Sequence, residues 1–118
     1  MADHRVISSR FPYLPLSFTV RDRTLEVEAL LATGFDGDLV VSPDLVLNGR
    51  PADGYFTLVL ADGREVEAAV YLGTVTIGGF SPIEAGITVL GDEPIVGLGI
   101  ASRCLITLDH GQRLIVEL

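Results

Sequence analysis

Side chains that could carry out chemistry are few in this chain. It holds one cysteine, Cys104, two histidines, His4 and His110, and no lysine. The histidines have no Cys or His companions at metal-ligand spacing, so we expect no metal site. A Ser-His-Asp triad stays open on spacing alone, but no Gly-x-Ser-x-Gly elbow is present to carry its serine. Cys104 lies in an apolar segment, where a cysteine is usually a small core residue.

Two glycine-containing segments resemble ligand-binding loops only in part. Residues 36–38, Asp-Gly-Asp, begin like a calcium loop, but apolar residues 39–41 follow where oxygen ligands are needed. The glycines of segment 73–79 do not form a phosphate-binding loop, because the Gly-Lys-Ser/Thr of that motif is missing. We therefore expect no cofactor.

The most informative stretch is residues 29–37, Ala-Leu-Leu-Ala-Thr-Gly-Phe-Asp-Gly. It reads as an apolar strand that runs into a tight turn at Thr33-Gly34. Residues 95–97, Ile-Val-Gly, form a fainter echo of this pattern, since an apolar pair is again followed by glycine. Position 32 lies where the strand meets the turn, and the chain has alanine there.

Composition predicts one folded domain that spans residues 1–118. Of these residues 48% are hydrophobic, which is typical of a compact domain with a core of its own. No apolar run approaches the roughly 20 residues that a membrane helix needs, and residues 1–10 lack the apolar region of a secretory signal. A single cysteine suits a reducing compartment, so we expect a cytoplasmic protein.

Charge argues against partners rich in phosphate. The 16 acidic residues are twice the 8 basic ones, and the net charge is −8. A protein that binds nucleic acid or an anionic membrane needs a basic face. We expect neither as a partner.

Short strands separated by turns predict an all-β fold, closed or sandwiched. No amphipathic pattern of helical length occurs, and one helical turn is expected at 98–102. Asp62-Gly63 lies between two strand-like runs and predicts a hairpin, because both positions tolerate positive φ. Turns are also expected at 21–23 and 44–51. The expected strands are 14–20, 25–31, 39–41, 56–60, 65–71, 74–77, 87–90, 95–96, 105–108 and 114–118.

Three features, taken in chain order, resemble the retropepsin-like aspartic proteases. Residues 30–37 are similar to the Asp-Thr-Gly loop of that family, and the hairpin with its tip at 62–63 resembles the flap that closes over bound peptide. Residues 95–97 resemble the apolar-apolar-Gly element behind the active-site loop. The resemblance covers about residues 14–108 and is closer to bacterial than to viral members. It implies a closed acid-protease barrel with a flap hairpin and one short helix.

The resemblance also implies a homodimer. In this family a water lies between two carboxylates that share one proton, because two like charges so close together cannot both ionise. The chain has one such turn, so the pair must come from two chains related by a twofold axis. The terminal strands interleave between subunits in viral relatives, but here residues 105–118 run beyond the usual end, and the strands that build the interface stay open.

Roles for individual positions follow from the same resemblance. Thr33 would hydrogen-bond across the dimer, and Gly34 would offer its carbonyl to the substrate backbone. Asp36 matches a carboxylate that lines the substrate channel and accepts backbone N–H bonds. Its usual arginine partner is replaced by Leu98, which leaves Arg103 or an arginine of the other chain as alternatives. The other expected substrate-binding residues are Leu60, Ala61, Asp62 and Gly63 of the flap, and Ile95 and Val96 of the pocket wall.

Ala32 stands where the family has its catalytic Asp, and a methyl group can neither hold nor deprotonate water. The sequence therefore predicts an aspartic endopeptidase of retropepsin type that is inactive as written but still binds protein or peptide substrate. Replacement of Asp by engineering is the simplest interpretation, because the surrounding motif is intact. A natural pseudoprotease, acting as a peptide-binding or scaffolding dimer, is the first alternative. An unrelated acidic β-barrel is the second.

Overall fold

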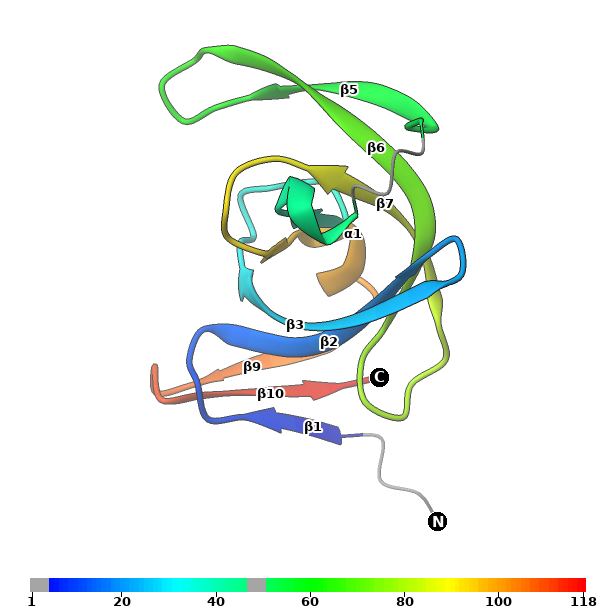
Figure 1. Cartoon of the computed structure of the whole chain (residues 1–118). Helices are drawn as coiled ribbons and strands as arrows, with labels where there is room; N and C mark the ends of the chain where they lie inside the picture. Colours follow the sequence, from blue (N-terminus) through cyan, green and yellow to red (C-terminus); the bar gives the residue numbers. More distant parts are fainter. Residues whose placement is uncertain (1–4, 47–50) are drawn as a thin grey trace.

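The computed structural model describes residues 5–46 and 51–118 (Figure 1). The expectations for His4 and for positions 47–50 lie outside the described residues. The elements are β1 (Arg5–Ser8), β2 (Tyr13–Val20), β3 (Arg23–Leu31), β4 (Leu39–Val41), a 3₁₀ helix η1 (Pro43–Leu45), β5 (Gly54–Val59), β6 (Glu65–Thr76), β7 (Ile83–Val89), β8 (Ile95–Val96), α1 (Leu98–Ala101), β9 (Leu105–Asp109) and β10 (Arg113–Glu117).

The larger sheet closes on itself. Its strand order is β2-β3-β8-β4-β7-β6-β5, and β2 pairs additionally with β6. Every second side chain of β2 is buried, as expected for a strand with one face in a core. The expected closed all-β barrel with one short α-helix is confirmed. Its core includes Leu14, Leu16, Phe18, Leu39, Val41, Val75, Ile87, Val96 and Ile100.

The two sequence segments that echo one another are neighbours in this sheet. β3 and β8 run parallel, with Leu30 opposite Ile95 and Leu31 opposite Val96. β8 also pairs antiparallel with β4. The chain therefore leaves β3 through the Thr33-Gly34 turn and returns in β4 on the far side of β8, so that β8 lies between them.

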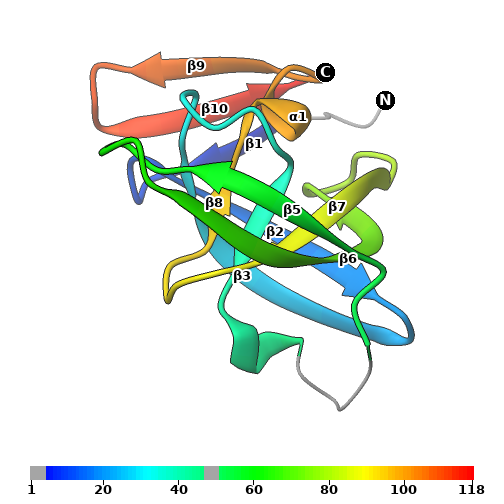
Figure 2. The ribbon, with the colours of Figure 1, turned by 90° about the horizontal axis from the view of Figure 1, so that it is seen from above.

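A second sheet contains the two ends of the described chain. Its order is β1-β10-β9, all antiparallel. Leu114 and Val116 of β10 are fully buried and join the core of the barrel. The C-terminal hairpin was expected, but β1 was not. Figure 2 shows this sheet on the same side of the molecule as α1.

Several expected boundaries were wrong. Arg23 already belongs to β3, and β7 begins at Ile83 rather than at 87. β6 is one strand through Thr76, because its second half pairs with both β2 and β7. Residues 43–45, at the start of an expected irregular turn, form η1. No helix in the described part of the chain is long and apolar enough to cross a membrane.

Candidate functional site

The turn after β3 is held by backbone hydrogen bonds on both sides. The Ala32 N–H donates to the Val96 carbonyl at 3.0 Å, which extends the β3–β8 pairing by one residue. The Phe35 N–H donates to the Ala32 carbonyl at 3.2 Å and closes the turn around Thr33 and Gly34. Thr33 and Gly34 are exposed, and Ala32 is half-buried. The turn thus presents its tip to solvent while its base is part of the sheet.

The rest of this loop, residues 35–38, lies against the segment 97–99 that follows β8. Gly97 packs so closely that a methyl group there would overlap the Gly37 carbonyl oxygen and lie 2.6 Å from the Phe35 carbonyl oxygen. Only glycine fits such an approach of two backbones. Three N–H groups donate across this contact, from Leu98 to the Phe35 carbonyl at 2.8 Å, from Gly99 to that of Gly37 at 2.9 Å and from Gly97 to that of Asp38 at 2.9 Å.

Asp38 was not among the expected site residues, yet its carboxylate anchors the loop. It is half-buried, and Oδ2 accepts the N–H of Gly86 in β7 at 2.8 Å. The sequence held one signal for it, the Asp-Gly-Asp of residues 36–38. Asp36, which was expected to accept backbone N–H bonds, has an exposed side chain. In this chain the carboxylate that accepts a backbone N–H within the loop belongs to Asp38.

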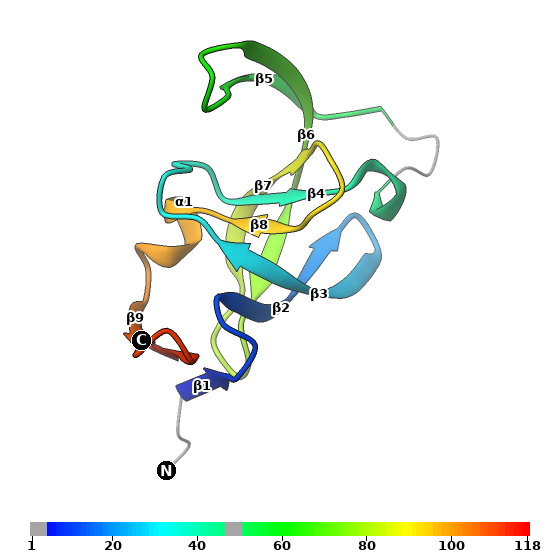
Figure 3. The ribbon, with the colours of Figure 1, turned by 90° about the vertical axis from the view of Figure 1, so that its left-hand side faces the viewer.

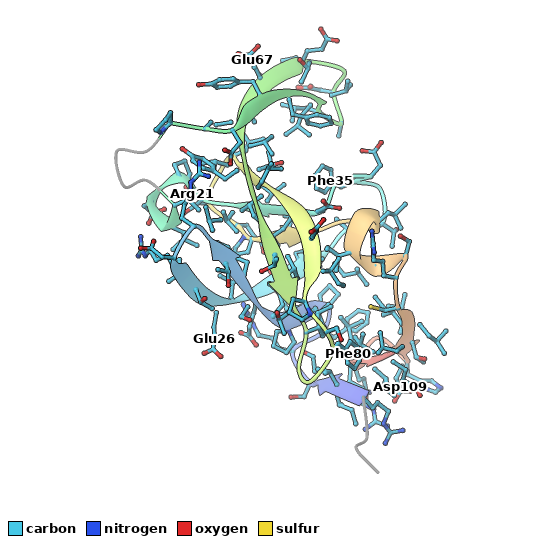
Figure 4. All side chains as sticks on the ribbon, turned by 90° about the vertical axis from the view of Figure 1, so that its right-hand side faces the viewer. Arg21, Glu26, Phe35, Glu67, Phe80 and Asp109 are labelled. Carbon is cyan, nitrogen blue, oxygen red and sulfur yellow. The ribbon has the colours of Figure 1, made fainter. Side chains whose placement is uncertain are left out.

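A cavity of about 330 Å³ lies between the Ala32 turn and the β5–β6 hairpin. Of the expected site residues, Ala32, Leu60 and Ile95 contribute to its wall. Phe35 also lines it, on the loop below the hairpin (Figure 4). Val96 is fully buried and packs in the barrel core instead. The full lining is Ala32, Phe35, Val40, Leu58, Val59, Leu60, Leu90, Gly91, Asp92, Glu93 and Ile95.

The β5–β6 hairpin projects above this loop (Figure 3). Its tip is closed by the Gly63 N–H, which donates to the Leu60 carbonyl at 2.9 Å. The expected hairpin is present, and of its two turn positions Gly63 has φ of 87° whereas Asp62 is not in the positive-φ region. The Arg64 N–H and Nε donate to the Asp62 carboxylate at 3.0 and 2.7 Å, and these bonds hold the pKa of Asp62 below its usual value. Ala61, Asp62 and Gly63 are exposed and outside the cavity lining.

Thr33 faces a different hollow, on the side of α1 and β9. This depression, hereafter the α1–β9 depression, has a volume of about 270 Å³. Cys104 is half-buried in its wall, and burial raises the pKa of its thiol. Exposed Leu98 and Leu108 also contribute. The complete lining is Leu31, Thr33, Leu98, Ala101, Ser102, Cys104, Ile106 and Leu108.

The chemistry available at the turn is limited by Ala32. A methyl group offers no lone pair to orient water and no proton to transfer, so this position supplies no general acid or base. Within residues 5–46 and 51–118, no three His, Cys, Asp or Glu side chains are grouped so that they could hold a metal ion. The geometry that remains is an apolar cavity beneath a hairpin, which suits binding of an extended chain.

Comparison with known proteins supports the same architecture. The fold is similar to a crystal structure of a retropepsin-like aspartic protease from Rickettsia conorii, with a TM-score of 0.64 and 19% sequence identity. The match covers 95% of this chain and 89% of that one. No protein-family model and no curated protein sequence matches the chain. The chain therefore has a retropepsin-like fold.

Proposed function

We propose that this chain is an inactive form of a retropepsin-like aspartic endopeptidase that binds extended polypeptide as a homodimer. The observation that carries the proposal is the place of Ala32. It follows the strand that pairs with β8, it opens the Thr-Gly turn, and it lines the cavity below the β5–β6 hairpin. An aspartate at this position would place its carboxyl group beside the same cavity.

In a homodimer, one carboxyl group per chain would suffice. Two aspartates brought together from two chains would share a proton, so that one acts as acid and the other as base. With alanine at both positions, the bound peptide would contact the same walls without a group to activate water. Binding and hydrolysis therefore separate in this chain.

Exposure of the turn supports a dimer. Thr33 and Gly34 are at the surface of the single chain, beside the α1–β9 depression. Leu98 and Leu108, which both line this depression, are 40% and 58% exposed. A second copy placed against this face would cover these side chains and bring the two turns together. A stable dimer buries about 800 Å² on each partner, and analytical ultracentrifugation measures whether one forms.

Restoring the carboxyl group tests the proposal. We expect Ala32→Asp to cleave an unstructured protein somewhere between about pH 4 and about pH 8, where one carboxyl group of a close pair is protonated. The matched control is Ala32→Asn, which has nearly the same shape and no acid group. Cleavage by the Asp variant alone supports the proposal. Equal absence of cleavage in both variants, with both folded, contradicts an endopeptidase that is inactivated at position 32 alone and points to a binding function.

A natural pseudoprotease is the second candidate, because the hydrogen bonds that hold the turn come from backbone groups and do not need a carboxyl group at position 32. Under this function the chain and Ala32→Asp both bind peptide, and neither cleaves it. Fluorescence anisotropy with a labelled extended peptide, run beside the cleavage assay, separates the two functions. The fold similarity argues against the third possibility, an unrelated acidic barrel.

A further inference from the structure

The cavity below the β5–β6 hairpin has a wall that is apolar over most of its extent and acidic in one part. Most of the lining is apolar, from Phe35 and Ile95 on the floor to Leu58 and Val59 of the hairpin. The wall formed by residues 91–93 is different, because it contributes two exposed carboxylates, Asp92 and Glu93. The described lining contains no basic side chain to neutralise them.

Hydrogen bonds attach the loop that forms the acidic wall to the barrel. The Tyr13 hydroxyl donates to Oε1 of Glu93, and this bond raises the pKa of Tyr13. The Pro94 carbonyl accepts the Leu30 N–H at 2.8 Å, which fixes the other side of the same loop. Arg10 stacks on the Tyr13 ring at 4.1 Å, but its Nη1 donates to Glu28 at 2.8 Å. Glu93 is therefore held at the cavity by the fold, and Asp92 lies next to it on the same loop.

We propose that this cavity receives a lysine or arginine side chain of the bound peptide. The aliphatic stem would lie on the apolar wall and the charged head would reach Asp92 and Glu93, as long basic side chains do at apolar surfaces with a polar rim. An uncharged side chain of the same length would leave both carboxylates without a positive charge beside them, and an acidic one would be repelled. The net charge of −8 adds a general attraction for basic peptides. This inference rests on the proposed function, because it names the substrate class of the same site.

The cavity has a size suited to one side chain of this kind. Its volume of about 330 Å³ is at the lower end of the range of about 300–1,000 Å³ typical of ligand pockets. Its walls are apolar over most of their extent, so the charge must lie at one end of the occupant. Lysine and arginine are the two natural side chains that are long, apolar along the stem and positive at the tip.

The test uses the chain as it stands, which binds without cleaving under the proposed function. A labelled, extended host peptide rich in Ala, Ser and Thr carries one Lys at each position in turn, with matched series of norleucine and of Glu. Norleucine keeps the stem and removes the ammonium group. At the best position we expect Lys to bind about three- to tenfold more tightly than norleucine at low salt, as two partly exposed ion pairs allow. The gap should narrow at about 0.5 M salt because of screening.

A variant pair links the preference to the cavity. Asp92→Asn should reduce the Lys-over-norleucine ratio at least twofold. The control, Glu26→Gln, removes the same charge from the exposed face of β3, on the side of the molecule away from Phe35 (Figure 4), and should leave the ratio unchanged.

The outcomes separate the two claims. Failure of every peptide to bind overturns the proposed function and this inference with it. Equal or tighter binding of norleucine overturns the inference alone, as does an equal loss of preference in Asp92→Asn and Glu26→Gln, which would trace the effect to net charge. A Lys preference lost only in Asp92→Asn supports the inference.

Discussion

The loop below the cavity and the hairpin above it are built in opposite ways. The loop, residues 32–38, is tied to β8 and to the segment after it by backbone hydrogen bonds, and it packs on Gly97 without room for one methyl group. The hairpin is at the end of the larger sheet, where β5 pairs with β6 alone among the described strands. Tyr55 and Val59 of β5 are 70% and 67% exposed. The cavity therefore has a fixed floor and an adaptable cover.

This difference shows which part of the site depends on residue 32. The hydrogen bonds that position the loop come from backbone groups and from Asp38, and none comes from the side chain of Ala32. The floor keeps its shape without a carboxyl group in the turn, and an aspartate there should be tolerated by the fold. The structure of the loop is thus independent of a carboxyl group at this position.

The sharpest test of the fixed floor is a methyl group on Gly97. Gly97→Ala should lower the free energy of unfolding by about 3 kcal/mol, because the methyl group overlaps carbonyl oxygens that cannot move away. Gly54→Ala, in the hairpin, is the matched control, since nothing lies within 4 Å of a Cβ there. It should change stability by less than about 0.5 kcal/mol. Urea denaturation measures both, and equal losses would remove the contrast between the two regions.

Removal of the Asp38 carboxylate should have the next largest effect. Asp38→Ala leaves the Gly86 N–H without its acceptor and should cost about 2 kcal/mol, in the range for a hydrogen bond to a charged group. Asp38→Asn keeps an oxygen acceptor and should cost less. Asp36→Asn, on the exposed side chain of the same loop, serves as the control and should be nearly neutral. If Asp36→Asn proved the more damaging change, Asp36 and not Asp38 would anchor the loop.

These two tests concern features that differed in how well they could be predicted from the sequence. The Thr33-Gly34 turn, the hairpin at Asp62-Gly63 and the β8 segment have local signals, because glycine and an apolar pair mark where a strand must stop. For Asp38 the only local signal is the Asp-Gly-Asp of residues 36–38, which does not indicate its role, since its partner Gly86 is 48 residues away along the chain. Only the packing of β7 beside the loop brings Asp38 and Gly86 together.

The terminal sheet likewise depends on contacts between segments that are far apart in the sequence. β1 is a strand because it pairs with β10 at the other end of the chain, and its four residues, Arg-Val-Ile-Ser, are too short a run to indicate one by themselves. Likewise Thr33 was expected to meet a partner chain, and the single chain places it at the surface beside β9. The positions of β1 and Thr33 therefore depend on contacts between distant segments, which the local sequence pattern does not indicate.

Substitutions in the β5–β6 hairpin, which covers the cavity, should change peptide affinity and leave the free energy of unfolding nearly unchanged. Val59 lines the cavity and is 67% exposed, so Val59→Ser should weaken peptide binding about threefold and leave the unfolding free energy within about 0.5 kcal/mol. Tyr55→Ser, on the same strand but outside the cavity lining, should leave binding unchanged. Anisotropy titrations measure this difference. Weaker binding in Tyr55→Ser alone would mean that the peptide contacts β5 outside the cavity.

The smallest expected effect concerns the base of the hairpin. The Leu72 N–H donates to Asp53 at 2.8 Å and Arg21 pairs with it at 3.0 Å, which together lower the pKa of Asp53. A lowered pKa in the folded state stabilises the protein above the ordinary value of about 4, and this contribution is lost as the pH falls through the folded pKa. Asp53→Asn should therefore lose less stability than the parent between about pH 5 and about pH 2. Identical pH dependence in the two proteins would show that Asp53 does not secure the hairpin.

We propose that two copies of the Ala32 turn would form one hydrolytic site if each carried a carboxyl group. The most direct test is the cleavage rate of Ala32→Asp measured across a dilution series through the dimer dissociation range. We predict that the rate per chain falls on dilution, because two chains share one site, and that mixing with excess parent chain suppresses it. Cleavage with a constant rate per chain, unaffected by the parent chain, would contradict a site that is shared between two chains.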